Sequence, residues 1–123
     1  MSILYEEIRG LLRQVASHED GRITANILFP KDFTGFKGHF PGNPVVPGVC
    51  KVLSVLVLLD ASQKTKAVLK TIVLAKFLSL VTCDQEVCVE LWREHQRDAQ
   101  RVKAVFKSAD KKVAEIQIEV TYA

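Results

Sequence analysis

The sequence has no apolar run that approaches the roughly 20 residues a helix needs to cross a bilayer. Its longest such run, residues 52–59, is better interpreted as part of a buried helix. The N-terminal residues MSILYEEIRG carry acidic side chains early and lack the apolar centre of a signal peptide. We therefore expect no membrane span and no export, and a cytoplasmic protein.

Cysteine is scarce, with 3 residues in 123, and their spacing matches no metal site. Cys83 and Cys88 could lie near each other around a turn, but an odd number leaves one thiol without a partner. We expect reduced, partly buried thiols. We predict no metal site and no cofactor.

Neither sign of charge is in large excess, since the formal net charge is +3 and 25% of the residues are charged. No basic run is interleaved with aromatic residues, so nucleic acid is not an expected partner. The mild positive charge permits docking of an acidic carrier protein. The chain shows no repeat, low-complexity segment or linker. We expect residues 1–123 to form one domain with its own core.

Apolar segments between turn residues predict six strands along the chain. Four of them alternate as half-buried strands do, and residues 68–81 are instead strongly apolar and β-branched. The six strands cover residues 11–16, 22–29, 68–81, 86–92, 100–108 and 112–122. A short helix or irregular lead-in precedes them at residues 2–10. A helix from residue 47 to about residue 61 is apolar on nearly every face and must be buried on all sides. A curved antiparallel sheet wrapped around that helix would bury it, which predicts an α+β fold.

The stretch GHFPGNPVVPG at residues 38–48 has three prolines and three glycines, which cannot lie inside a helix or a central strand. Pro47 and Gly48 fit the first turn of the following helix, where a missing N–H costs nothing. Free N–H groups at that turn can receive an oxygen with partial negative charge. His39 lies just before this helix and titrates near neutrality, so the loop is a candidate reaction centre. The alternative is a proline-rich turn with an incidental surface histidine.

GHFPGNPVVPGV resembles the signature loop of the hot-dog-fold 3-hydroxyacyl-(acyl-carrier-protein) dehydratases, whose motif reads roughly HFPGxPxxPGV and runs into a central helix. The match covers the loop almost residue for residue and, more loosely, the order of elements over residues 11–122. The resemblance implies a hot-dog fold, with a curved antiparallel sheet around a long central helix. It also implies at least a dimer with sites shared between subunits. Its substrate would be an acyl thioester on acyl carrier protein or coenzyme A, as in fatty-acid or related acyl-chain biosynthesis.

The resemblance also implies roles for individual residues. His39 matches the catalytic histidine, and Gly48 matches the backbone N–H donor to the thioester oxygen. Phe40, Val49 and Leu53 are expected, with Gly48, to contact the substrate. The family carries a carboxylate fourteen residues after the histidine, where this chain has Leu53.

Leucine cannot transfer a proton, so the missing carboxylate leaves two alternative functions open. The first is a dehydratase-like lyase with His39 as its main catalytic group. The alternative is a non-catalytic acyl-thioester binding subunit, or a heterodimer partner that lacks the helix carboxylate. A hot-dog thioesterase is a third possibility, against which the HFPG loop argues.

Other side chains near Leu53 could compensate for the missing carboxylate. Asp60 lies seven residues further along roughly the same helix face, about 10 Å away, and is expected to be solvated. Lys51 must extend to solvent, find a partner or lose its charge. Cys50 is either a small buried thiol or a reactive one with a lowered pKa.

The remaining histidines, His18 and His95, are expected on solvated turns. Basic residues on two predicted strands could face an acidic carrier protein or simply form an exposed face. They are Arg93, Arg97, Arg101, Lys103 and Lys107.

Overall fold

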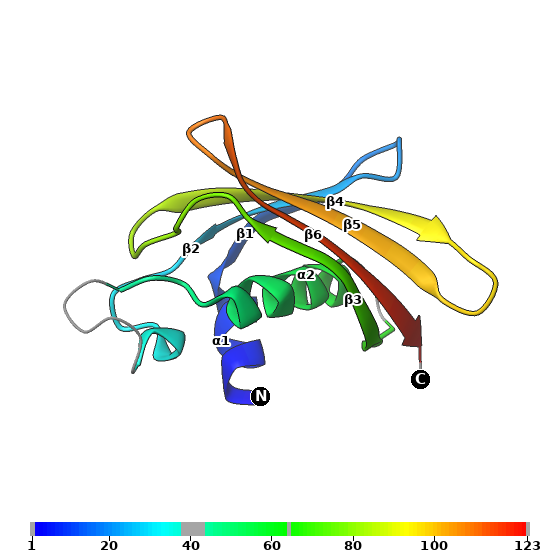
Figure 1. The fold of residues 1–123 in the computed structure, drawn as a ribbon, viewed down its shortest axis with the longest axis horizontal. Coiled ribbons are helices and arrows are strands. Elements are labelled where there is room, and N and C mark those ends of the chain that lie inside the picture. The colour runs from blue at the N-terminus through cyan, green and yellow to red at the C-terminus, as the bar shows by residue number, and fades with distance from the viewer. Residues whose placement is uncertain (1, 38–43, 64, 123) are drawn as a thin grey trace.

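The computed structural model describes residues 2–37, 44–63 and 65–122, which form one curved sheet with a helix on its concave side (Figure 1). The elements are α1 (Ser2–Leu11), β1 (Leu12–Ser17), β2 (Ile23–Leu28), the 3-10 helix η1 (Thr34–Phe36), α2 (Gly48–Ser62), β3 (Ala67–Phe77), β4 (Glu86–His95), β5 (Gln100–Ser108) and β6 (Lys111–Tyr122). The six strands are antiparallel in the order β1-β2-β4-β5-β6-β3. This arrangement confirms the predicted α+β hot-dog fold.

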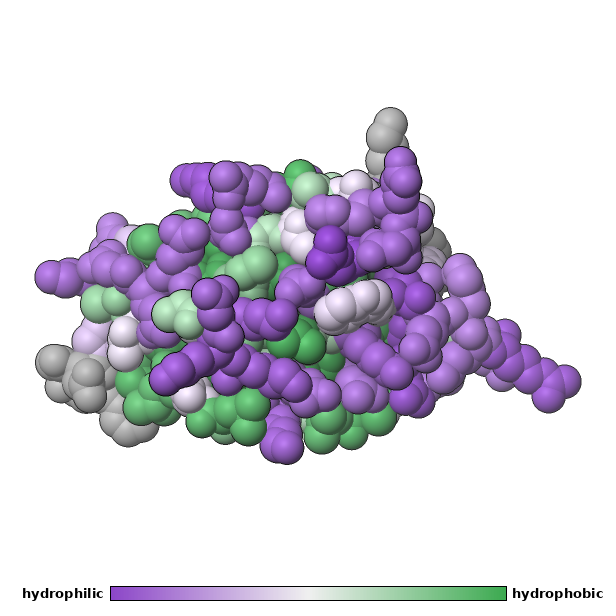
Figure 2. All heavy atoms as spheres, turned by 90° about the horizontal axis from the view of Figure 1, so that it is seen from above, coloured by the Kyte–Doolittle hydropathy of each residue, from purple (hydrophilic) through white to green (hydrophobic). Residues whose placement is uncertain are grey.

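The strands in the middle of the sheet follow the alternation of their sequences. In β4, Val87, Val89 and Leu91 are at most 1% exposed and belong to the core around α2. Glu90, between them, points to the convex face, where it pairs with Arg22 at 3.0 Å and Lys107 at 3.1 Å. Polar side chains cover most of this convex face (Figure 2). The charged pairs therefore lie on the solvent side and the apolar side chains pack on the helix.

Helix α2 is enclosed as its sequence predicts, since Val55, Val57 and Leu58 have no exposed surface. The sheet covers one side of α2, and α1 covers another through the fully buried Ile8. Pro47 precedes the first helical residue with an extended backbone (φ −62°, ψ 150°). The helix thus begins and ends one residue later than the sequence indicates.

Strand β3 lies at an edge of the sheet and pairs only with β6 among the described strands. The prediction that this strand continues to residue 81 is wrong. The amides of Leu78 and Ser79 both bind the carbonyl of Val113, which turns the chain away from the sheet. Many apolar side chains on and just after β3 are exposed: Val68, Leu69, Ile72, Val73, Phe77, Leu78 and Leu80.

Candidate functional site

The first turn of α2 presents backbone N–H groups to its surroundings. Among the described residues no side chain caps this end of the helix. The amides of Cys50 and Lys51 bind the carbonyl of Pro47, at 3.0 Å and 3.3 Å. The amides of Gly48 and Val49 have no acceptor within the part of the chain that the structure describes. They are the donors that an oxygen at this helix end would meet.

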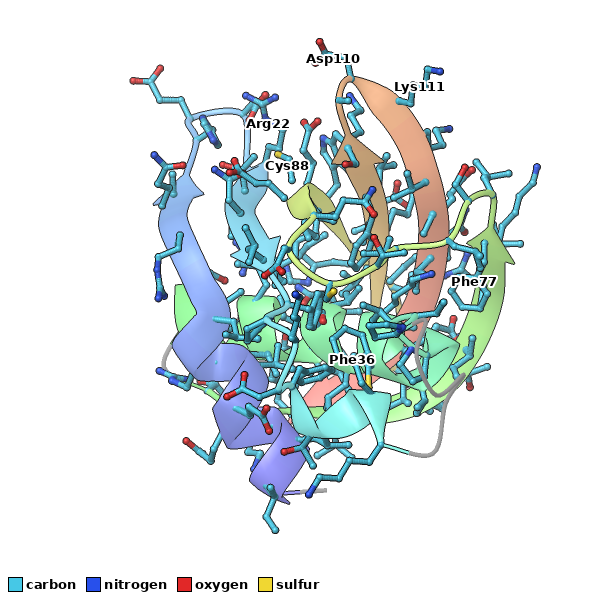
Figure 3. All side chains as sticks on the ribbon, turned by 90° about the vertical axis from the view of Figure 1, so that its left-hand side faces the viewer. Arg22, Phe36, Phe77, Cys88, Asp110 and Lys111 are labelled. Atoms are coloured by element: carbon cyan, nitrogen blue, oxygen red, sulfur yellow. The ribbon has the colours of Figure 1, made fainter. Side chains whose placement is uncertain are left out.

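The Phe77 ring packs directly on this turn, at the end of β3 (Figure 3). A Cβ atom added to Gly48 would lie 2.7 Å from Cε2 of Phe77. Only glycine allows this approach without a shift of the ring. The sequence pattern identifies Gly48 but not Phe77, because the contact joins residues that are far apart in the chain.

A groove of about 340 Å³ runs between α2 and β3, starting at this turn. Its lining is Gly48, Val49, Val52, Leu53 and Leu56 from α2, and Leu69, Ile72, Ala75 and Phe77 from β3. Every lining residue is apolar, so the groove suits a hydrocarbon chain and offers no group that could transfer a proton. It brings together Gly48, Val49 and Leu53, while the other two predicted site residues, His39 and Phe40, lie outside the described residues.

Asp60 does not behave as the sequence predicts, because it is buried and only 7% exposed. Its Oδ2 accepts a hydrogen bond from the Tyr5 hydroxyl at 2.7 Å, and its Oδ1 accepts one from the Ala67 amide at 2.8 Å. Burial, and then the bond to Asp60, raise the pKa of Tyr5 to about 12. Asp60 therefore joins α1 and β3 to the end of α2, and it cannot replace the carboxylate missing at Leu53.

Lys51 does not extend to solvent, since it is 4% exposed. Its Nζ lies 4.9 Å from the centre of the Phe77 ring, so an aromatic face is its partner. Burial lowers the pKa of Lys51. Lys51 and Leu53 are separated by about 200° around the helix. Lys51 is not part of the groove lining, and its amine lies beside the Phe77 ring and not beside Leu53. It therefore does not take over the role of a carboxylate at Leu53.

Replacing Lys51 with methionine is expected to raise the free energy of unfolding by about 1 kcal/mol or more near neutral pH, because a buried charge is removed. In the wild type the pKa is lower in the folded than in the unfolded chain. The unfolded chain therefore binds the proton more tightly, and stability rises with pH up to the unfolded pKa of about 10.4. Urea unfolding near neutral pH and at mildly alkaline pH measures both effects.

The gap in stability between Lys51→Met and wild type should narrow as the pH rises. Lys76→Met is the control, because Lys76 is an exposed lysine on β3. A gap that does not change with pH, or an equal effect of Lys76→Met, would contradict the burial of a charged amine at residue 51.

The three cysteines form no disulfide, as predicted, and are free. Cys50 is 1% exposed, and burial raises the pKa of its thiol. The interpretation of Cys50 as a reactive thiol with a lowered pKa is therefore wrong. Within the described ranges no three His, Cys, Asp or Glu side chains are grouped so that they could hold a metal ion. No helix of these ranges is long and apolar enough to cross a membrane.

The prediction that His95 lies on a turn is wrong, because β4 continues to His95, which pairs with Gln100 of β5. Arg93 bonds to Gln63 after α2, on the concave side. Lys103 and Lys107 instead pair with glutamates of β4, at 3.1 Å each. The basic residues of these strands therefore do not form one face. His18 is exposed on its turn, as expected, and contacts Thr24.

Comparison with known proteins agrees with the resemblance of the HFPG loop to dehydratases. A family model described as ApeI-like, ApeI dehydratase, matches residues 15–117. The 3-hydroxyacyl-(acyl-carrier-protein) dehydratase FabZ of Lactobacillus helveticus (strain DPC 4571) is 36% identical over 96 residues, which are 72% of this chain and 64% of that protein. The chain thus spans just under two thirds of the length of this curated relative.

Solved structures share the fold at lower identity. A chain of the dehydratase heterocomplex ApeI:P from Xenorhabdus doucetiae has a TM-score of 0.69 and 16% identity, with 89% of this chain and 92% of that chain covered. The sigma28-regulated virulence protein Cj0977 from Campylobacter jejuni has a TM-score of 0.68 and 12% identity, with 94% and 95% covered. At these identities the likeness concerns the fold.

Proposed function

Because this chain belongs to the ApeI-like dehydratase family, we propose that it is a lyase that interconverts 3-hydroxyacyl and 2-enoyl thioesters. One observation carries the proposal. The N–H groups of Gly48 and Val49 stand at the mouth of an apolar groove, and five residues separate Gly48 from the HFPG sequence. An acyl thioester has both of the matching parts, a polar carbonyl and a hydrocarbon chain.

In this proposal the thioester oxygen accepts a hydrogen bond from the Gly48 amide, and the helix dipole stabilises the charge that develops there. The chain beyond the carbonyl lies along Val49 and Leu53 in the groove. His39 removes the α-proton, the C–O bond at the β-carbon breaks, and the double bond forms. His39 then returns the proton to the departing hydroxyl, which leaves as water. A single imidazole thus serves both transfers, because Leu53 offers no proton.

Self-association through β3 forms part of the same proposal. The free edge of this strand is eleven residues long and carries exposed apolar side chains on both faces. Such an edge pairs readily with another strand. A second chain on β3 would extend the sheet and cover the groove, which would exclude water from the thioester.

The second candidate is a non-catalytic subunit that works with another hot-dog chain. Leu53 favours it, because the chain lacks the second proton carrier expected on α2. A fold relative, the dehydratase heterocomplex ApeI:P, is by its own description an assembly of unlike chains. A partner of this kind would supply the carboxylate.

The test is an assay of 2-enoyl thioester hydration. The reaction is measured as the loss of absorbance of the conjugated thioester. The substrates are carried on acyl carrier protein in one series and on coenzyme A in another. Wild type is expected to turn over the substrate and His39→Ala to fall to background. His18→Ala, at an exposed turn histidine, is the control and should retain the wild-type rate.

Equal activity of His39→Ala and wild type would overturn the catalytic role of His39. A silent wild type that becomes active when mixed with a second dehydratase-like chain would support the heterodimer candidate. A silent wild type that also fails to bind a non-hydrolysable acyl thioester analogue would exclude both functions.

A further inference from the structure

A polar hollow of about 520 Å³ lies where α2 ends, at the opposite end of that helix from Gly48. The ends of β4 and β6 and the start of β5 meet there, on the right of Figure 1. Side chains from these strands and from the segment after α2 line it, namely Gln63, Thr65, Arg93, His95, Gln100 and Tyr122. The hollow is separate from the apolar groove, with which it shares no residue.

Hydrogen bonds hold several of these side chains in place. Arg93 donates from Nη1 to Oε1 of Gln63 at 3.0 Å, and Gln63 donates from Nε2 to the carbonyl of Thr65 at 3.1 Å. The Tyr122 hydroxyl bonds to Oε1 of Gln100. The oxygens of both glutamines are thus engaged. What remains for a ligand is largely donors: the other guanidinium N–H groups, the His95 ring and the Gln100 amide nitrogen.

The charge of the hollow is positive. None of its lining residues is acidic, and Arg93 takes part in no ion pair among the described residues. The other arginines and lysines on these strands behave differently, since Arg101, Lys103 and Lys107 each pair with a glutamate. Within the described ranges Arg93 bonds only to a neutral amide, so no carboxylate offsets its charge and it can attract an anion.

We propose that this hollow binds a small organic phosphate. Arginine presents several donors in a planar fork that matches phosphate oxygens. Donors from several elements surround the space, which suits the three terminal oxygens of a phosphate ester better than the two of a carboxylate. The volume falls in the range of small-molecule sites and exceeds what an inorganic ion fills. The Tyr122 and His95 rings provide surface for the organic part.

The test is a titration of the ¹⁵N-labelled chain, monitored through its amide chemical shifts. The probes are phenyl phosphate, inorganic phosphate and benzoate. We expect saturable shifts confined to the residues around the hollow, with phenyl phosphate binding more tightly than either of the other two. Arg93→Gln is expected to weaken phenyl phosphate binding about tenfold or more, because a charge-assisted bond is lost.

Lys103→Gln is the matched control, because it removes a cation from the same pair of strands on the opposite face. Its affinity should equal that of wild type. His95→Asp, which places a negative charge in the hollow, should also abolish binding, and it guards against a folding defect specific to Arg93→Gln. Absence of saturable shifts, equal losses in Arg93→Gln and Lys103→Gln, or a preference for benzoate would overturn the proposal. None of these results depends on dehydratase activity.

Discussion

Leu53→Glu is expected to raise the rate of enoyl-thioester hydration by roughly 10²-fold or more, the usual contribution of a positioned acid–base group. Leu53 lies in the apolar groove with Gly48 and Val49 and is 6% exposed. A glutamate there could protonate the departing hydroxyl in dehydration and, in the hydration direction that the assay follows, accept a proton from the attacking water. The assay is the same loss of enoyl-thioester absorbance, with kcat and KM determined separately.

Leu53→Gln is the control for this gain in rate. Glutamine has nearly the same shape as glutamate and is also polar, but it transfers no proton. Only Leu53→Glu should gain activity, mainly in kcat, and the gain should disappear in the double variant with His39→Ala. The glutamate will lower stability, so thermal unfolding of both variants must show a folded chain at the assay temperature. Equal rates for Leu53→Glu and Leu53→Gln would mean that the groove does not hold the reacting carbons beside residue 53.

Much of the fold could be predicted from the sequence because one physical pattern repeats. Strands that bury one face must alternate, and β5 lies at residues 100–108 as the alternation indicates. Strand β4 extends three residues beyond its predicted end because His95 and its neighbours pair with β5, and backbone pairing does not require apolar side chains. Helix α2 shows its burial in the sequence because most of its buried positions, such as Val55, Val57 and Leu58, are apolar.

The candidate site could be predicted only as far as the local motif extends. The sequence places Gly48 at the helix start through the adjacent proline, and Leu53 follows from its distance to His39. The burial of Asp60 depends on Tyr5 of α1 and on the Ala67 amide, and the burial of Lys51 depends on the Phe77 ring. These partners lie on other elements, and no spacing within the helix indicates them.

The edge of β3 should be the surface through which two chains associate, so Ile72→Asp is expected to convert a dimer into a monomer. Ile72 is 49% exposed on this strand and lines the groove. A charge there costs the folded monomer little, because the side chain already reaches solvent. In a dimer the same charge would be buried without a partner, which costs several kcal/mol and weakens association by about 100-fold or more.

Light scattering coupled to gel filtration measures the mass of each variant at micromolar concentration. Val15→Asp is the matched control, because Val15 is 42% exposed on β1, the strand at the other edge of the sheet. If Val15→Asp dissociates the chain and Ile72→Asp does not, the interface is at β1 and the groove stays open in the assembly. A monomeric wild type would exclude self-association through β3. The exposed apolar edge of β3 would then be left for an unlike chain, which is what the heterodimer candidate requires.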